Sequence, residues 1–137
     1  ASLHKRKFGE NLSQHFEAHE KYGIPAWFVH KCRDYVGCEE TMPFDQHELL
    51  AMVAPRPLAL ATATEDYHAD PKGEFLAAKA ASEVYALFGS KGLDAVQMPQ
   101  PDQYISGDIS FHYRAGKHDQ TPFDWAHYFA LAEHFLK

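Results

Sequence analysis

The chain has 137 residues, of which 45% are hydrophobic, enough for the core of one ordinary domain. Its formal net charge of −6 argues against a nucleic-acid-binding surface, and the short basic run at residues 4–7 is interpreted as the solvated start of a helix. The most apolar window, residues 49–63, is interrupted by Pro55, Arg56 and Pro57, so no membrane-spanning segment is expected.

The first half of the chain is expected to be helical and irregular. Apolar residues among charges predict an amphipathic helix over residues 3–20, and a short helix is expected at residues 29–35 within an aromatic-rich segment. Asp45 is a good N-cap, and a glutamate three residues later completes a capping-box pattern. The helix that follows, residues 46–53, must end before Pro55 because proline cannot continue it.

The second half alternates strands and helices. Residues 58–63 form a short continuous apolar run, which is typical of a buried strand in a parallel sheet. A long helix is predicted over residues 71–88. Its expected buried side carries Phe75, Leu76, Ala80, Val84 and Leu87. A last strand is predicted over residues 105–113, and a proline begins a final helix over residues 123–136.

This order of elements predicts an α/β fold with a parallel sheet, because a helix between two strands forms a βαβ crossover. Only two convincing strands are present, however. A parallel sheet is normally covered on both faces and both edges, so two strands alone would leave an apolar edge open. The rest of the sheet is therefore expected to come from another segment or another chain.

Neither the cysteines nor the histidines predict a metal site. Cys32 and Cys38 are too few for a disulfide scaffold and lack a second Cys/His pair at zinc-finger spacing. We interpret them as packing residues, with a disulfide between them as the alternative. His15 and His19 lie four residues apart on an expected helix, but the glutamate of the His-Glu-x-x-His pattern is not beside His15 and no third ligand is evident.

Two side chains at strand ends could serve acyl-transfer chemistry. Serine hydrolysis needs a nucleophile, a histidine that takes its proton and a carboxylate that orients the histidine. Asp66 and His118 follow the two predicted strands, whose parallel pairing would bring both residues to one edge of the sheet. The order of acid before histidine matches the α/β-hydrolases, in which the serine comes first. Taken singly, His118 would be interpreted as a surface histidine and Asp66 as a helix cap.

The serine itself is not found in this sequence. The nucleophile-elbow pattern Gly-x-Ser-x-Gly is absent, and the glycines around Ser90 have the wrong spacing. We therefore expect residues 1–137 to be the C-terminal segment of a single α/β-hydrolase domain whose nucleophile-bearing N-terminal part is not present. Such a chain is expected to be inactive in isolation.

Three long motifs resemble the glucuronoyl esterases, carbohydrate esterase family fifteen. They are MPFDQHELLA at residues 42–51 with APRP at 54–57, EDYHADPKGEF at 65–75 and HYRAGKHD at 112–119. The resemblance begins near residue 6 and covers most of the chain. It implies the C-terminal part of an α/β-hydrolase three-layer sandwich. It also implies a hydrolase that cleaves the ester joining 4-O-methyl-glucuronic acid on xylan to lignin alcohols, by a Ser-His-acid mechanism without metal or other cofactor.

The resemblance also implies roles for individual residues. His118 falls on the family's catalytic histidine, and Asp66 falls on the acid position after the seventh strand, which many bacterial members use. Other members place a glutamate after the sixth strand, which here would lie upstream of Ala1, so Asp66 as the acid, as a helper or as neither all remain open. His68 stands where the family usually has a tryptophan that lines the sugar pocket. An imidazole offers less stacking surface but adds a hydrogen-bonding tip.

Partners and location follow from the same resemblance. The implied partners are the serine-bearing N-terminal remainder of the protein and a glucuronoxylan-type ester substrate. The charge and the interrupted apolar window separately argue against nucleic acid and a membrane as partners. A secreted or periplasmic location is implied because plant-wall substrates lie outside the cell. The alternative is a non-catalytic subunit that binds carbohydrate or completes the sheet of another chain.

Overall fold

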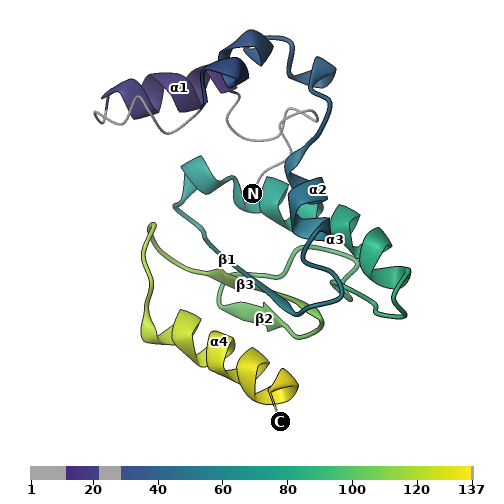
Figure 1. The fold of residues 1–137 in the computed structure, drawn as a ribbon. Helices are drawn as coiled ribbons and strands as arrows, with labels where there is room; N and C mark the ends of the chain where they lie inside the picture. The colour runs from purple at the N-terminus through teal and green to yellow at the C-terminus, as the bar shows by residue number, and fades with distance from the viewer. Residues whose placement is uncertain (1–11, 22–28, 137) are drawn as a thin grey trace.

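A computed structural model describes residues 12–21 and 29–136 of the chain. Its elements are, in order, α1 (Leu12–Lys21), the 3₁₀ helices η2 (His30–Tyr35) and η3 (Glu39–Thr41), α2 (Gln46–Ala51), β1 (Leu58–Ala63), the 3₁₀ helix η4 (Tyr67–Ala69), α3 (Pro71–Ala86), β2 (Gln103–Ile105), β3 (Ile109–Arg114) and α4 (Pro122–Phe135). Helices α2 and α3 lie on one face of the sheet and α4 lies on the other, which gives three layers (Figure 1). No helix in the described ranges is both long enough and apolar enough to cross a membrane.

The sheet has the order β1-β3-β2. Strands β1 and β3 are parallel and in register from Leu58 opposite Ile109 to Ala63 opposite Arg114, as the βαβ pattern predicts. The prediction of one strand over residues 105–113 is wrong, because β2 and β3 form an antiparallel hairpin there. The turn passes Gly107, where an added Cβ would lie 2.9 Å from a backbone carbonyl oxygen, so a side chain has no room at this bend.

One edge of the sheet is open. Strand β2 pairs with the outer side of β3, but β1 has no second neighbour among the strands that the structure describes. The first four residues of β1 are accordingly only half-buried, although their apolar run is typical of an interior strand. The incomplete sheet expected from the sequence is therefore present.

The main core lies between α3 and the sheet. It is built from Phe75, Ala78, Ala81, Tyr85, Leu93, Ile109 and Phe111. The rings of Phe75 and Phe111 meet edge to face with centroids 5.6 Å apart. The predicted buried position of Leu87 is wrong: this side chain is 81% exposed because α3 ends at Ala86. Phe75 of the predicted buried side lies in this core, and Leu76 packs against it.

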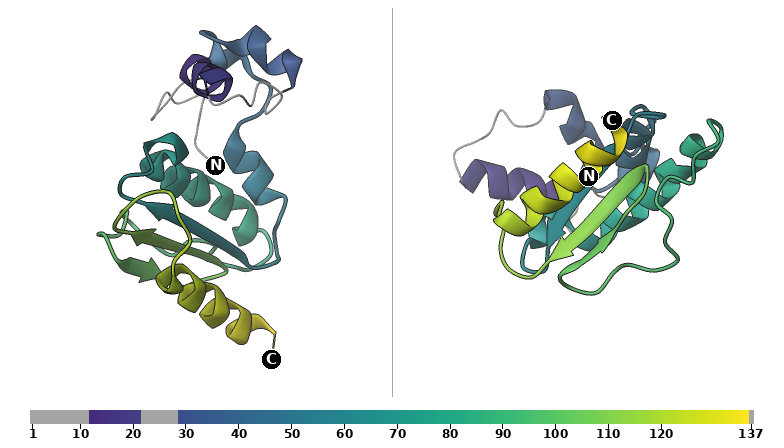
Figure 2. Two further views of the ribbon diagram at one scale, coloured as in Figure 1. Left: turned by 90° about the vertical axis from the view of Figure 1, so that its left-hand side faces the viewer. Right: turned by 90° about the horizontal axis from the view of Figure 1, so that it is seen from below.

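The N-terminal elements form a second, smaller cluster away from the sheet (Figure 2). Helix α1 buries Leu12 and Phe16 against Met42, and Cys32 packs against this group. Both cysteines are free thiols, so the packing interpretation of Cys32 is confirmed and the alternative disulfide is wrong. Residues 3–11 of the first predicted helix, the basic run within them and the side chain of His19 lie outside the described residues.

The other predicted elements are observed with small shifts at their ends. Asp45 caps α2, and its carboxylate accepts from the amide of Gln46 at 2.8 Å. Helix α2 stops at Ala51, two residues before the predicted end. Strand β1 has the predicted bounds, and α4 agrees with the predicted final helix to within one residue at each end. The sequence pattern therefore places the elements on which the candidate site is built.

Candidate active site

Two loops meet at the carboxyl ends of β1 and β3. The Thr64 amide donates to the Arg114 carbonyl at 2.9 Å, and the Glu65 amide donates to the Gly116 carbonyl at 2.8 Å. In return, the Gly116 amide donates to the hydroxyl oxygen of Thr64 at 2.9 Å. Gly116 has φ +114°, a conformation that favours glycine. The pairing thus continues past the strand ends and holds the two loops side by side.

Asp66 and His118 meet across these loops. Nδ1 of His118 lies 2.6 Å from Oδ2 of Asp66. Because a carboxylate oxygen accepts, Nδ1 carries the proton and Nε2 of the same ring is left free to accept one. The Asp66 side chain is 11% exposed and that of His118 is 89% exposed. The structure therefore brings the two predicted residues together in the geometry of a base and its orienting acid, while their catalytic role stays a prediction.

His68, the third predicted site residue, lies just beyond this pair on η4. Its ring is exposed and stacks on His15 of α1, with centroids 5.9 Å apart and planes inclined by 29°. The sequence did not predict this contact between His68 and helix α1. The predicted contact between His68 and a sugar stays a prediction.

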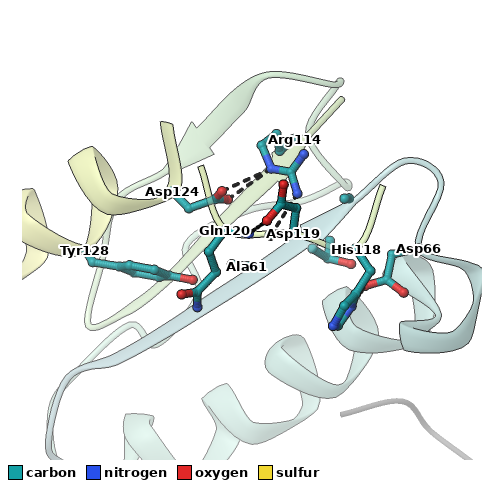
Figure 3. A pocket seen from close by; sticks show the side chains of 10 residues that line it. Ala61, Asp66, Arg114, His118, Asp119, Gln120, Asp124 and Tyr128 are labelled. Carbon is teal, nitrogen blue, oxygen red and sulfur yellow. Dashed lines mark hydrogen bonds and ion pairs between the residues drawn. The ribbon is translucent and has the colours of Figure 1, made fainter. Parts of the chain in front are cut away.

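A hollow of about 420 Å³ opens beside the His118–Asp66 pair (Figure 3). It is lined by Ala61, Thr62, Ala63, Asp66, Arg114, His118, Asp119, Gln120, Asp124 and Tyr128. The acid–histidine pair lies at one end of the hollow and Tyr128 of α4 at the other, while His68 is not among the described residues that line it. The lining is therefore made by the strand ends, the loop after β3 and α4, which is where open α/β folds place their sites.

A buried group of charged and polar side chains that sequence reasoning missed forms one wall of the hollow, where Arg114 and Asp124 line it. Nε2 of His112 lies 2.8 Å from Oδ1 of Asp124, and Nε of Arg114 donates to Oδ2 of the same carboxylate at 3.1 Å. All three residues are buried: His112 is 1% exposed, Asp124 is 2% exposed and Arg114 is 8% exposed. Since Phe111 faces α3, alternation along β3 turns His112 and Arg114 towards α4. That alternation of two polar residues within a strand was the one available sign in the sequence.

The environment shifts the pKa values of this group. Burial alone would raise the pKa of Asp124, but the amide and hydroxyl of Thr121, the ring of His112 and the charge of Arg114 outweigh it and lower that pKa from its ordinary value. Burial lowers the pKa of His112, although Asp124 opposes this shift. His112 is therefore neutral near pH 7, with its proton on Nε2 towards the carboxylate.

These shifts predict how stability depends on pH. A lowered histidine pKa means that the unfolded chain takes up the proton first, so stability is full above pH 6.5 and falls as the pH drops through the folded value. Replacing His112 with Gln keeps a donor for Asp124 but removes this titration. We expect the slope of unfolding free energy against pH, just below pH 6.5, to fall by up to about 1.4 kcal/mol per pH unit.

The measurement is denaturant unfolding at a series of pH values. Burial and the charge of His112 also lower the pKa of His127, so the slope should shrink without vanishing. His134→Gln on the exposed side of α4 serves as the matched control and should leave the slope unchanged. A slope in His112→Gln equal to that of the parent would contradict the prediction.

Comparison with known proteins identifies relatives for the whole chain. Residues 3–89 match the family model described as "Glucuronyl esterase, fungi". The carbohydrate esterase MZ0003, from an unknown prokaryotic organism, is 42% identical over 136 residues, which are 99% of this chain and 30% of that protein. This chain therefore spans about a third of the length of that relative.

Solved structures show the same likeness in three dimensions. A promiscuous CE15 esterase from a marine bacterial metagenome superposes with a TM-score of 0.87 and 42% identity, over 97% of this chain and 32% of the other. The glucuronoyl esterase of Solibacter usitatus superposes with a TM-score of 0.83 and 39% identity, over 97% of this chain and 33% of the other. The expected fold class, part of an α/β-hydrolase sandwich, is thereby confirmed.

Proposed function

Because the chain belongs to the glucuronoyl esterase family, we propose that it supplies the histidine and the acid of a serine-type carboxylesterase. The substrate we propose is the 4-O-methyl-glucuronoyl ester that links xylan to lignin. The observation that carries this proposal is the 2.6 Å contact between His118 Nδ1 and Asp66 Oδ2 at the carboxyl edge of the sheet. With Nδ1 bound to the carboxylate, Nε2 is the nitrogen of the exposed neutral ring that can accept a proton, as a base requires.

In this mechanism, His118 makes two proton transfers. Its Nε2 takes the proton of a serine that lies on a segment outside these residues, and the serine oxygen attacks the carbonyl carbon of the uronate ester. The protonated ring then gives that proton to the departing alcohol oxygen. Water attacks the acyl-enzyme by the same route and restores the serine. Asp66 holds the tautomer of the ring and stabilises its positive charge between the two transfers.

The serine is proposed to lie on the remainder of a single hydrolase domain, which makes the chain inactive alone. Two observations support this arrangement. Strand β1 has no second neighbour in the described sheet, and an unpaired inner strand needs one. In addition, Trp125 and Phe129 on α4 are 48% and 59% exposed, an apolar surface that further segments of the fold would cover.

We propose that the full protein acts outside the cytoplasm in lignocellulose degradation. Its proposed substrate is part of an insoluble wall polymer, which an enzyme reaches only after export. His68 is proposed to touch the glucuronoyl ring, since it lies two residues after Asp66 with its ring exposed.

The first prediction concerns the base. Replacing His118 with Ala in the full-length esterase should lower kcat on a benzyl ester of glucuronic acid by about 10⁴-fold or more, because serine loses its proton acceptor. His134→Ala, an exposed histidine on α4, is the matched control and should retain full activity. If the wild-type protein shows no hydrolysis with its serine-bearing part present, the non-catalytic alternative replaces this proposal.

The second prediction tests whether Asp66 is the acid. Asn at this position keeps the shape of the side chain but favours the wrong tautomer of His118, so kcat should fall by about 10⁴-fold. The comparison is with Asp102→Asn, an exposed acid that contacts the loop after β3 through the Ala115 amide but not His118. A loss of less than about tenfold in Asp66→Asn would assign the acid to the glutamate that other members place after the preceding strand.

The third prediction concerns substrate affinity at His68. A Trp here offers a larger stacking face to a sugar ring, worth about 0.5–1.5 kcal/mol, so KM for the same ester should fall by about two- to tenfold in His68→Trp. The kcat value should stay unchanged, because the added contact is made equally in the ground state and the transition state. His30→Trp, at an exposed position on η2, controls for the bulk of the new ring. An unchanged or raised KM would remove His68 from the sugar pocket.

A further inference from the structure

The loop that carries His118 is held by the side chain of the residue that begins it. Arg114 is the last residue of β3, and its Nη1 donates to the carbonyl of Ala115 at 3.1 Å. Its Nη2 donates to the carbonyls of Lys117 at 2.8 Å and Asp119 at 2.9 Å. These last two carbonyls flank His118 on either side. The loop therefore surrounds one guanidinium group, and His118 lies on the solvent-exposed side of the loop.

The guanidinium is itself fixed from behind. Its Nε donates to both oxygens of Asp124, at 3.3 Å and 3.1 Å. Asp124 accepts in turn from the amide of Thr121 at 2.6 Å and from its hydroxyl at 2.8 Å, in the capping box that begins α4. The ring of His112 binds the same carboxylate. The position of Arg114 is thus set by helix α4 and strand β3 together.

Only an arginine can make this set of contacts. The planar guanidinium carries five N–H donors in a fixed fork, so it can bind a carboxylate with one edge and carbonyl groups with the other. A lysine has the same charge but a single nitrogen at the end of a flexible stem. It could pair with Asp124 or reach one carbonyl, but it could not hold both sides of the loop at once.

The loop is packed closely against this group. At Gly116, whose φ is +114°, an added Cβ would lie 3.1 Å from Nη1 of Arg114. His118 receives little support from packing, because its side chain is 89% exposed. Its ring is held by Asp66, and its backbone is held by the two carbonyls that Arg114 binds. The direction of the ring therefore depends on both attachments.

We propose that Arg114, locked by Asp124, is a positioning residue that holds His118 in line with Asp66 and with the serine. The inference rests on the proposed function of His118 as the base. Arg114 acts through the loop, because its guanidinium is engaged by Asp124 and by the loop carbonyls on either side of His118. If the contacts of Arg114 to the loop are lost, the imidazole of His118 is displaced from the position needed for attack. This displacement lowers the rate of the chemical step and leaves substrate binding unchanged.

The test is Arg114→Lys in the full-length esterase, assayed on the benzyl ester of glucuronic acid. We expect kcat to fall by about 10- to 100-fold while KM stays within about twofold, since a small displacement of the base affects only the transition state. Arg56→Lys is the matched control, because Arg56 is exposed and its Nε donates to a single carbonyl. That variant should match the wild type in both constants.

A second readout does not depend on the reaction. The proton on His118 Nδ1, hydrogen-bonded to Asp66, gives a low-field line in the proton NMR spectrum. This line should be present in the wild type and in Arg56→Lys, and it should broaden or disappear in Arg114→Lys. A wild type without esterase activity would defeat the proposed function, and the NMR comparison would still decide whether Arg114 holds the ring.

A kcat within about twofold of the wild type in Arg114→Lys, or an unchanged low-field line, would show that Arg114 does not position the histidine. If Arg114→Lys does not fold, Asp124→Asn takes its place, because it removes the charge that fixes Nε of Arg114 and leaves the sequence of the His118 loop unchanged. The same loss of kcat at constant KM supports the proposal there, and normal activity overturns it.

Discussion

The parallel pairing of β1 with β3 is the constraint on which the site depends. Helix α3, with 16 residues, and the short strand β2 lie between the two strands in the chain, and the pair ends in register with Ala63 opposite Arg114. Three residues further along one loop is Asp66, and four residues along the other is His118. Two side chains 52 residues apart in sequence therefore meet at 2.6 Å. A shift of one residue in the register of β3 would exchange the two faces of that strand, so that His112 and Arg114 would point towards α3.

The buried charges behind the site are better explained by geometry than by stability. A buried ion pair costs desolvation energy that its attraction only partly offsets, so apolar residues of the same size are often as stable. Here the carboxylate of Asp124 binds a strand residue, His112, and the end of a second loop, Thr121. It also orients Arg114. One carboxylate thus joins a strand, a helix start and the loop that carries the histidine.

Much of the fold could be predicted because local patterns specify it. The apolar run of β1, the prolines that begin α3 and α4, and the cap at Asp45 each act within a few residues, and all are observed. The predictions failed where packing decided. The strand predicted over residues 105–113 is a hairpin because the chain bends at Gly107 against a neighbouring backbone, and Leu87 lies past the end of its helix in solvent. Neither result is visible in periodicity alone.

The sequence by itself determined the βαβ order, the family resemblance and the placing of Asp66 and His118 after two neighbouring strands, because these depend on residue types at strand ends and on the order of elements. Only the tertiary structure decided how the histidine is held. The contacts of Arg114 run to backbone carbonyls, which every residue carries and which no sequence pattern distinguishes. The partner of His68 was likewise set in three dimensions, because α1 lies about fifty residues earlier in the chain and reaches that ring only through packing.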